Sequence, residues 1–285
     1  MASMNKLTRD ERARILHMLC EDNSIRAITR MTGASKTTVT KLVVDAGAAA
    51  AWYQDRTFHN LSCKRLQIDE IWGFVAAKQK NVADMKAKID GAGDAWLWMA
   101  TDAQTKIVPC WHVGSRDGGA AMEFIDDLAS RLANRVQITT DGHKAYLDAI
   151  DTAFGGQVDY AMLVKLYGPS LEGDRRYSPA ECTGAIKTPI QGHPDLKHVS
   201  TSYAERNNLN VRMHSRRMTR LTNAFSKKME NHAHAMALHF LYYNFVRIHQ
   251  TLKMSPAMAA GVTKRLWEMT DVVDVLEAWE VTYKD

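Results

Sequence analysis

The chain has 285 residues, of which 46% are hydrophobic and 24% charged, a balance that is typical of a folded globular protein and excludes a disordered one. The sequence lacks a long uncharged apolar run and a signal-peptide pattern, so we expect no membrane span and a cytoplasmic protein. Its four cysteines form no Cys-x-x-Cys pair, which argues against a zinc ribbon and indicates reduced thiols. Because the net charge of +5 is only mildly basic, the distribution of charge matters more than its total.

Residues 5–47 have the pattern of three short helices. Thr8–Glu11 forms a capping box ahead of the first helix, and Ser24 and Ser35 are N-cap residues for the second and third. Gly33 permits the tight turn between the last two helices. This arrangement predicts a helix-turn-helix DNA-binding domain.

The third of these helices presents short polar and basic side chains on its outer face. Such side chains can reach base edges and phosphates in a DNA major groove. An ordinary three-helix cap with a solvated face is the alternative interpretation. The candidate DNA-binding residues are Lys36, Thr37, Thr38 and Lys41.

Residues 60–260 alternate between strand-like and helix-like segments. The order strand, strand, strand, helix, strand, helix, strand, helix is that of a ribonuclease-H-like α/β domain, in which three antiparallel strands are extended by parallel ones. The expected strands cover 65–77, 94–101, 106–114, 135–140 and 159–166, and the expected helices between them cover 118–133 and 144–154.

This order of strands and helices indicates a role for two carboxylates. Asp69 lies within the first strand and Asp141 follows the fourth, so adjacent central strands would bring them side by side. Paired carboxylates repel unless cations neutralise them, and their hard oxygens favour Mg²⁺ or Mn²⁺. Glu70 is the rival of Asp69, but successive strand side chains point to opposite faces, and we choose Asp69. Taken singly, Asp69 could be an exposed strand carboxylate and Asp141 the start of an Asp-Gly turn.

A third carboxylate, Glu205, opens a basic segment. Ser202–Glu205 reads as a capping box, which offers a purely structural role for this residue. However, residues 206–228 contain seven lysines and arginines and no acid, which favours a nucleic-acid track over pairing with acids elsewhere in the fold. On the basic helix expected here, Glu205, Asn208, Arg212 and Arg216 would fall on one stripe. The N-terminal unit favours DNA over RNA as the ligand. The candidate DNA-binding residues of this segment are Arg212, Arg216, Arg217 and Arg220.

Three further segments bear less directly on function. Residues 168–198 are rich in proline and glycine and predict an irregular connection, either near the substrate or on the surface. The histidines His232, His234, His239 and His249 are interpreted as structural, because His-x-His on a helix directs the two rings far apart. Residues 262–285 predict an amphipathic C-terminal helix that docks on the domain or on a second subunit.

With these motifs in order, the chain resembles the bacterial insertion-sequence transposases of the DDE, retroviral-integrase-like superfamily, most nearly the insertion-sequence-one group. The match extends over nearly the whole chain, and its motifs are specific in combination and spacing. The segments that carry it are residues 67–72, 140–146, 200–207 and 243–249, followed by Leu252 and Pro256.

The resemblance implies that Asp69, Asp141 and Glu205 are a catalytic triad that binds two Mg²⁺ ions. It implies a transposase that binds terminal inverted repeats, cleaves DNA and joins the freed 3′ hydroxyl to target DNA, acting as a homo-oligomer on paired ends in the nucleoid. Members of this group often carry an N-terminal cysteine-rich zinc module, which this chain lacks. A ribonuclease-H-like nuclease without strand transfer, or a helix-turn-helix regulator on an inactive DDE domain, are the alternatives.

Overall fold

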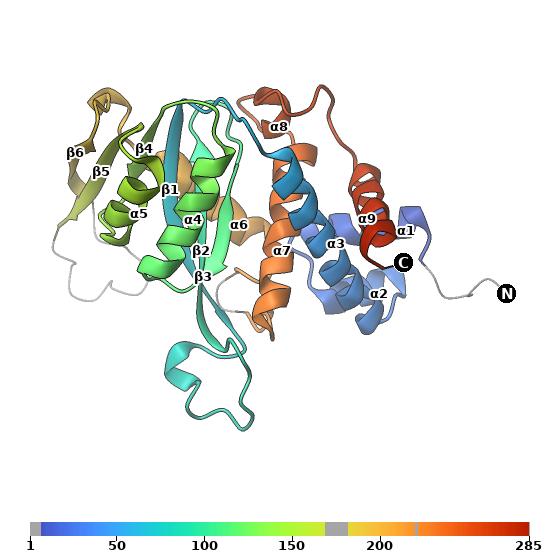
Figure 1. Cartoon of the computed structure of the whole chain (residues 1–285). Coiled ribbons are helices and arrows are strands. Elements are labelled where there is room, and N and C mark those ends of the chain that lie inside the picture. The colour runs from blue at the N-terminus through green and yellow to red at the C-terminus, as the bar shows by residue number, and fades with distance from the viewer. Residues whose placement is uncertain (1–6, 169–181, 220–221, 285) are drawn as a thin grey trace.

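A six-stranded mixed sheet forms the centre of the computed structural model, which describes residues 7–168, 182–219 and 222–284. The strand order is β3-β2-β1-β4-β5-β6, with β1 antiparallel to β2 and parallel to β4 (Figure 1). Three antiparallel strands extended by parallel ones confirm the expected ribonuclease-H-like fold class. The strands are β1 (Arg65–Val75), β2 (Gly93–Asp102), β3 (Trp111–Gly114), β4 (Val136–Thr140), β5 (Val158–Tyr167) and β6 (Cys182–Gln191).

Helices cover both faces of this sheet. The neighbouring helices α4 and α5 lie on one face, and α6 packs on β1 and β2 from the other (Figure 1). In the sheet region the helices are α4 (Gly118–Arg131), α5 (Ala145–Phe154) and α6 (Ser202–His214), with short 3₁₀ turns at Gln79–Asn81 and Leu196–His198. The remaining helices are α1 (Arg9–Cys20), α2 (Ile25–Thr32), α3 (Lys36–Thr57), α7 (Met229–Leu241), α8 (Pro256–Ala259) and α9 (Met269–Tyr283), and a π-helical turn covers Tyr242–Val246.

The N-terminal helices begin where their capping residues predict. The Thr8 side chain accepts a hydrogen bond from the Glu11 backbone N–H, and Ser24 and Ser35 accept equivalent bonds at the starts of α2 and α3. Gly33 ends α2 in the left-handed conformation, with φ +75°. The third helix runs on to Thr57, because its alanine-rich second half packs against α7 and α9.

Four expected boundaries are wrong. The third strand starts only at Trp111, because Asn244 bonds both backbone groups of Val108. The expected irregular connection contains β6, which pairs antiparallel with β5, while its residues 169–181 lie outside the described part of the chain. The basic helix α6 ends at His214, and the C-terminal helix begins at Met269.

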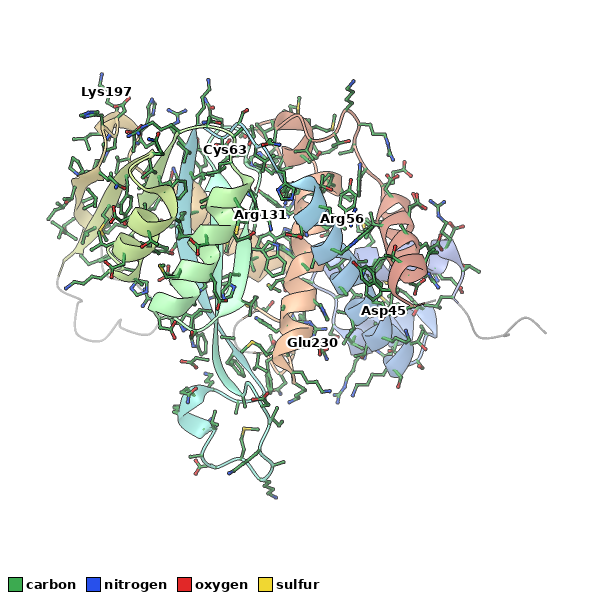
Figure 2. The ribbon with its side chains drawn as sticks, in the orientation of Figure 1. Asp45, Arg56, Cys63, Arg131, Lys197 and Glu230 are labelled. Atoms are coloured by element: carbon green, nitrogen blue, oxygen red, sulfur yellow. The ribbon has the colours of Figure 1, made fainter. Side chains whose placement is uncertain are left out.

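One continuous apolar core joins the helical units to the sheet. It includes Ile15 of α1, Val39 of α3, Phe124 of α4 and Val273 of α9. Figure 2 labels the buried Arg131 of α4, which lies at the edge of this core. Its guanidinium forms ion pairs with Asp127 on its own helix and Asp55 on α3. In the described parts of the chain, no helix has both the length and the hydrophobicity that a bilayer crossing requires.

Candidate active site

The sheet brings Asp69 and Asp141 together at its centre. Strands β1 and β4 run parallel, with Gln67 opposite Thr139, so continuing that register places Asp69 beside Asp141. The ladder ends with β4 at Thr140, and both side chains therefore lie where the two strands separate. Oxygen atoms of Asp69, Asp141 and Glu70 all lie within 4.8 Å of one another.

Asp69 is held by two hydrogen bonds in an acidic, desolvated environment. Its Oδ1 accepts the backbone N–H of Glu70 at 2.9 Å, and its Oδ2 accepts the side-chain amide of Asn208 on α6 at 2.7 Å. Burial, and then the neighbouring charges of Glu70 and Asp141, raise the pKa of Asp69 to about 7. A nearby cation would therefore stabilise the ionised form of Asp69.

Asp141 also fulfils the role of a turn residue. Its Oδ1 accepts the backbone N–H of His143 at 2.8 Å, as an aspartate that begins an Asp-Gly turn does. The structural interpretation and the functional one are therefore compatible, because the turn fixes the carboxylate beside Asp69.

Glu70 is closer to the site than the parity of the strand predicted. The two carboxylates do have partners on opposite faces of the sheet, since Asp69 bonds α6 while Glu70 bonds Tyr146 of α5 at 2.6 Å and Arg116 at 2.7 Å. Yet the two side chains come within 4.8 Å of each other beside the open edge of β1. The expectation that only one of them reaches the site is therefore wrong, although Glu70 is buried and neutralised by Arg116.

Glu205 lies on the first turns of α6, outside the group of three oxygens. Its Oε1 accepts hydrogen bonds from the Thr201 hydroxyl at 2.6 Å and from the Lys165 ammonium of β5. The backbone N–H of Ser202 bonds Ser200 instead, so Glu205 does not close the expected capping box. Its negative charge nevertheless contributes to the raised pKa of Asp69.

Helix α6 is fixed to the sheet by side chains close to the carboxylates. The Gln67 side-chain oxygen of β1 accepts the backbone N–H groups of Tyr203 and Ala204, and so caps the start of α6. One turn later, Asn207 donates to Thr101 of β2. These contacts hold Glu205 at the side of the sheet where Asp69 lies.

The candidate DNA-binding residues of α3 lie in its first two turns. Lys36, Thr37 and Lys41 are exposed, and Thr38 is half-buried with its hydroxyl against Ser35. Lys41 forms an ion pair with Asp45 one turn along the helix. Three of the four side chains thus face solvent.

The basic residues that follow Glu205 do not form one helical stripe. Arg212 donates to the backbone carbonyls of Met218 and Trp72, and Arg216 forms an ion pair with Asp22. Because α6 ends at His214, Arg216 and Arg217 lie in the segment after it, whereas Arg220 lies outside the described residues. The expected continuous row on one helix face is wrong.

Two histidines of α7, His232 and His239, are buried among core side chains, whereas His234 is half-buried. His232 and His239 are fully or almost fully buried, and burial lowers their pKa to about 4 and about 3. They are neutral core residues, as the helical spacing indicated.

The side-chain partners of the two neighbouring carboxylates Asp69 and Glu70 could not be assigned from local sequence patterns, because they are far away along the chain. Arg116 and Tyr146 are 46 and 76 residues away from Glu70, and Asn208 is 139 residues away from Asp69. Only Glu70 could have been found, from its place beside Asp69. The carboxylate oxygens at the centre are a donor set that suits a hard divalent cation such as Mg²⁺.

The chain matches no protein-family model and no curated protein. It has a low similarity to solved structures, among them the Mos1 transposase paired-end complex with left transposon end, with 13% identity over 53% of this chain and a TM-score of 0.21. The chain spans 59% of the length of that protein. A pre-cleavage Mos1 transpososome has 9% identity and a TM-score of 0.26, over 85% of this chain and 79% of that one. The Mos1 strand transfer complex has 12% identity and a TM-score of 0.25, over 85% and 77%.

Proposed function

We propose that this protein is a transposase that cuts DNA and joins the cut strand to target DNA with the help of divalent cations. The observation that carries the proposal is the pair Asp69 and Asp141, whose oxygens lie within 4.8 Å of each other on neighbouring parallel strands of a ribonuclease-H-like sheet. Burial, then the charge of Glu70, then that of Asp141 raise the pKa of Asp69, so a positive charge beside the pair would stabilise its ionised form.

Asp69, Asp141 and Glu205 are the residues that would hold two Mg²⁺ ions, with Mn²⁺ as a substitute. Bound there, the cations would activate the attacking oxygen and stabilise the leaving oxygen at the phosphorus atom. To bind a cation, Glu205 would give up its ion pair with Lys165, whose flexible side chain is 32% exposed. Asn208 bonds Asp69, while Glu70 is bonded to Arg116 and Tyr146 and is left out of the proposed ligand set.

DNA binding is assigned to two surfaces. The exposed Lys36, Thr37 and Lys41 of the helix-turn-helix unit, with Thr38, would contact the terminal inverted repeats. Arg217, with Arg212 and Arg216 as supporting residues, would contact the phosphate backbone. Arg220, which lies outside the described residues, is assigned to the same role from the sequence alone. A homo-oligomer on paired ends completes the proposal.

The test uses a plasmid that carries the gene with its flanking DNA. Purified protein with Mg²⁺ is expected to nick this plasmid and to produce joined products, and Asp69→Asn and Asp141→Asn should both reduce these products to the level of a control with EDTA. Binding to the flanking DNA in gel shifts should persist, because the exposed cations of α3 are unchanged.

Three results would contradict parts of the proposal. Full activity in both variants would exclude the two aspartates as the site. Cleavage without joined products would indicate a plain nuclease, and binding without cleavage in the wild type would indicate a regulator.

Lys36→Ala combined with Lys41→Ala should weaken binding and reduce its dependence on salt.

A further inference from the structure

A row of four aromatic rings leads away from the carboxylates along the hairpin of β1 and β2. Trp72 and Phe74 alternate with Glu70 along β1 and so share its face of the strand, and Trp96 of β2 is the cross-strand partner of Trp72. The rings of Trp72 and Phe74 are 5.7 Å apart, and Phe225 continues the row at 4.8 Å from Phe74. All four side chains are half-buried rather than enclosed in the core.

Each part of this aromatic row has a cation above a ring. The guanidinium of Arg116 lies 4.7 Å from the ring centre of Trp96, and the ammonium of Lys78 lies 5.8 Å from that of Trp72. At the other end the Lys227 ammonium is 3.9 Å from the ring centre of Phe225. Arg116 also binds Glu70, so the row of cations begins at the carboxylate cluster.

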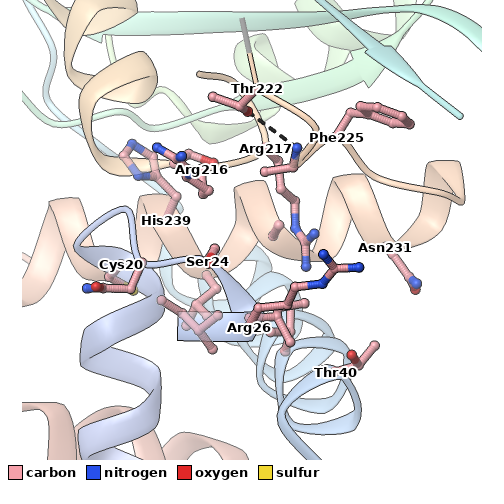
Figure 3. Close-up of a pocket in the computed structure, with 18 of the residues that line it drawn as sticks. Cys20, Ser24, Arg26, Thr40, Arg216, Arg217, Thr222, Phe225, Asn231 and His239 are labelled. Atoms are coloured by element: carbon pink, nitrogen blue, oxygen red, sulfur yellow. Dashed lines mark hydrogen bonds between the residues drawn. The ribbon is translucent and has the colours of Figure 1, made fainter. Parts of the chain in front are cut away.

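The far end of the aromatic row opens into a basic cavity. Phe225 and Lys227 belong to the lining of this cavity, which has a volume of about 870 Å³. Figure 3 labels Arg26 of α2 and Arg216 and Arg217 from the segment after α6 around it. Among the described residues that line the cavity, none is acidic. Burial lowers the pKa of Arg217, which indicates a desolvated cation beside this space.

We propose that the aromatic row and the cavity bind an unpaired nucleic-acid strand. Unpaired bases expose their faces and can stack on the rings of Trp72, Phe74 and Phe225, whereas the bases of a duplex are already stacked on each other. The cations beside the rings and in the cavity match the phosphates of such a strand. The inference rests on the proposed function and specifies the DNA that the site would bind. One strand of that DNA would lie unpaired on the side of the carboxylates where Glu70 and Arg116 are found.

The direction in which the hairpin of β1 and β2 extends is compatible with a bound unpaired strand. Figure 1 shows the far ends of β1 and β2 extending beyond the helices that cover the rest of the sheet. Trp72 and Phe74 lie near this end of β1 and are half-buried. Beyond them the hairpin carries exposed charges of both signs, the lysines Lys80, Lys86 and Lys88 and the acids Asp84, Asp90 and Asp94.

The test measures binding of the full chain to a fluorescent oligothymidylate of about 15 nucleotides and to a duplex of the same length, in EDTA, by fluorescence anisotropy. Trp72→Leu and Phe225→Leu keep an apolar side chain and remove the aromatic face. Since stacking contributes on the order of 1–3 kcal/mol for each base, each variant is expected to bind the single strand about tenfold more weakly. Duplex binding should change by less than about twofold, since the duplex does not use the rings.

Lys264→Gln, an exposed lysine close to α9, is the matched control for charge and should bind both probes as the wild type does. If a leucine variant fails to fold by circular dichroism, Lys78→Gln and Lys227→Gln carry the test, because both lysines are exposed. They should weaken single-strand binding and lower its salt dependence.

Unchanged single-strand binding in all folded variants would overturn the proposal. An equal loss for single strand and duplex would also overturn it, since that result identifies a general polyanion surface. The outcome is independent of catalysis. Ring-dependent binding in a wild type that never cuts the plasmid would contradict the proposed function alone, and a wild type that cuts without ring-dependent binding would contradict this inference alone.

Discussion

Asp69 makes the stability of the metal-free protein depend on pH. Folding raises the pKa of this carboxyl from its ordinary 3.8 to about 7, through burial and then through Glu70 and Asp141. A carboxyl with a raised pKa contributes stability that is present below its unfolded pKa and is lost as the pH rises between about 4 and about 7. This carboxyl should therefore lower the free energy of unfolding of the metal-free protein at pH 8.

Asp69→Asn should raise the melting temperature in EDTA at pH 8, because an amide carries no charge and its single oxygen can still accept one of the two hydrogen bonds that Asp69 accepts. The expected gain is roughly 2–4 °C for each kcal/mol of repulsion relieved, and it should shrink toward pH 4. Asp84→Asn, which changes an exposed carboxylate of the hairpin, is the control and should have no such effect. An Asp69→Asn protein that is less stable than the wild type at pH 8 would refute this account of the site.

The two aspartates could be predicted from the sequence because their positions depend on strand order alone. Parallel neighbouring strands align their ends, and that rule required only the alternation along β1 and the apolar run before Asp141. The bonds of Glu70 to Arg116 and Tyr146 could not be predicted, because they depend on how α5 and the loop before α4 pack on the sheet. Strand parity gave the correct faces for Asp69 and Glu70 but not the distance between their carboxylates.

At the scale of elements, the close contact between α3 and α7 depends on one glycine. A Cβ atom at Gly47 would lie 2.3 Å from the backbone oxygen of His234, and backbone cannot move aside as a flexible side chain can. Gly47→Ala should therefore destabilise the protein by about 1–3 kcal/mol or more, as overpacking does, measured by urea unfolding. Gly118→Ala, where nothing lies within 4 Å of the added atom, is the control and should have an effect within about 0.5 kcal/mol. Equal effects of the two substitutions would contradict the proposed contact.

The ends of the elements show where sequence patterns stop being informative. Capping residues predicted the starts of α1, α2 and α3, because an N-cap is a local bond between a side chain and a nearby backbone group. The end of α6 could not be predicted, since no glycine or proline follows His214. There Arg212 bonds the carbonyls of Met218 and Trp72, a tertiary contact that sets the path of the chain.

At the scale of the whole molecule, the N-terminal helices, the sheet and α9 share one apolar core. The sequence predicts separate units at 5–47, 60–260 and 262–285, but a shared core couples their unfolding. Differential scanning calorimetry should therefore give one cooperative transition for the full chain, with equal calorimetric and van't Hoff enthalpies. Two resolved transitions, one of them unchanged by Gly47→Ala, would contradict this coupling.

Asp69 and Asp141 are proposed to form a divalent-cation site. Its most direct test is calorimetric titration of the full chain with Mn²⁺ at pH 8 and pH 6, for the wild type and for Asp69→Asn, Asp141→Asn and Glu205→Gln. The wild type should bind Mn²⁺ at pH 8 and more weakly at pH 6, where protons compete for Asp69, and each aspartate variant should lose a bound ion. Binding by both aspartate variants that equals the wild type at either pH would contradict the claim.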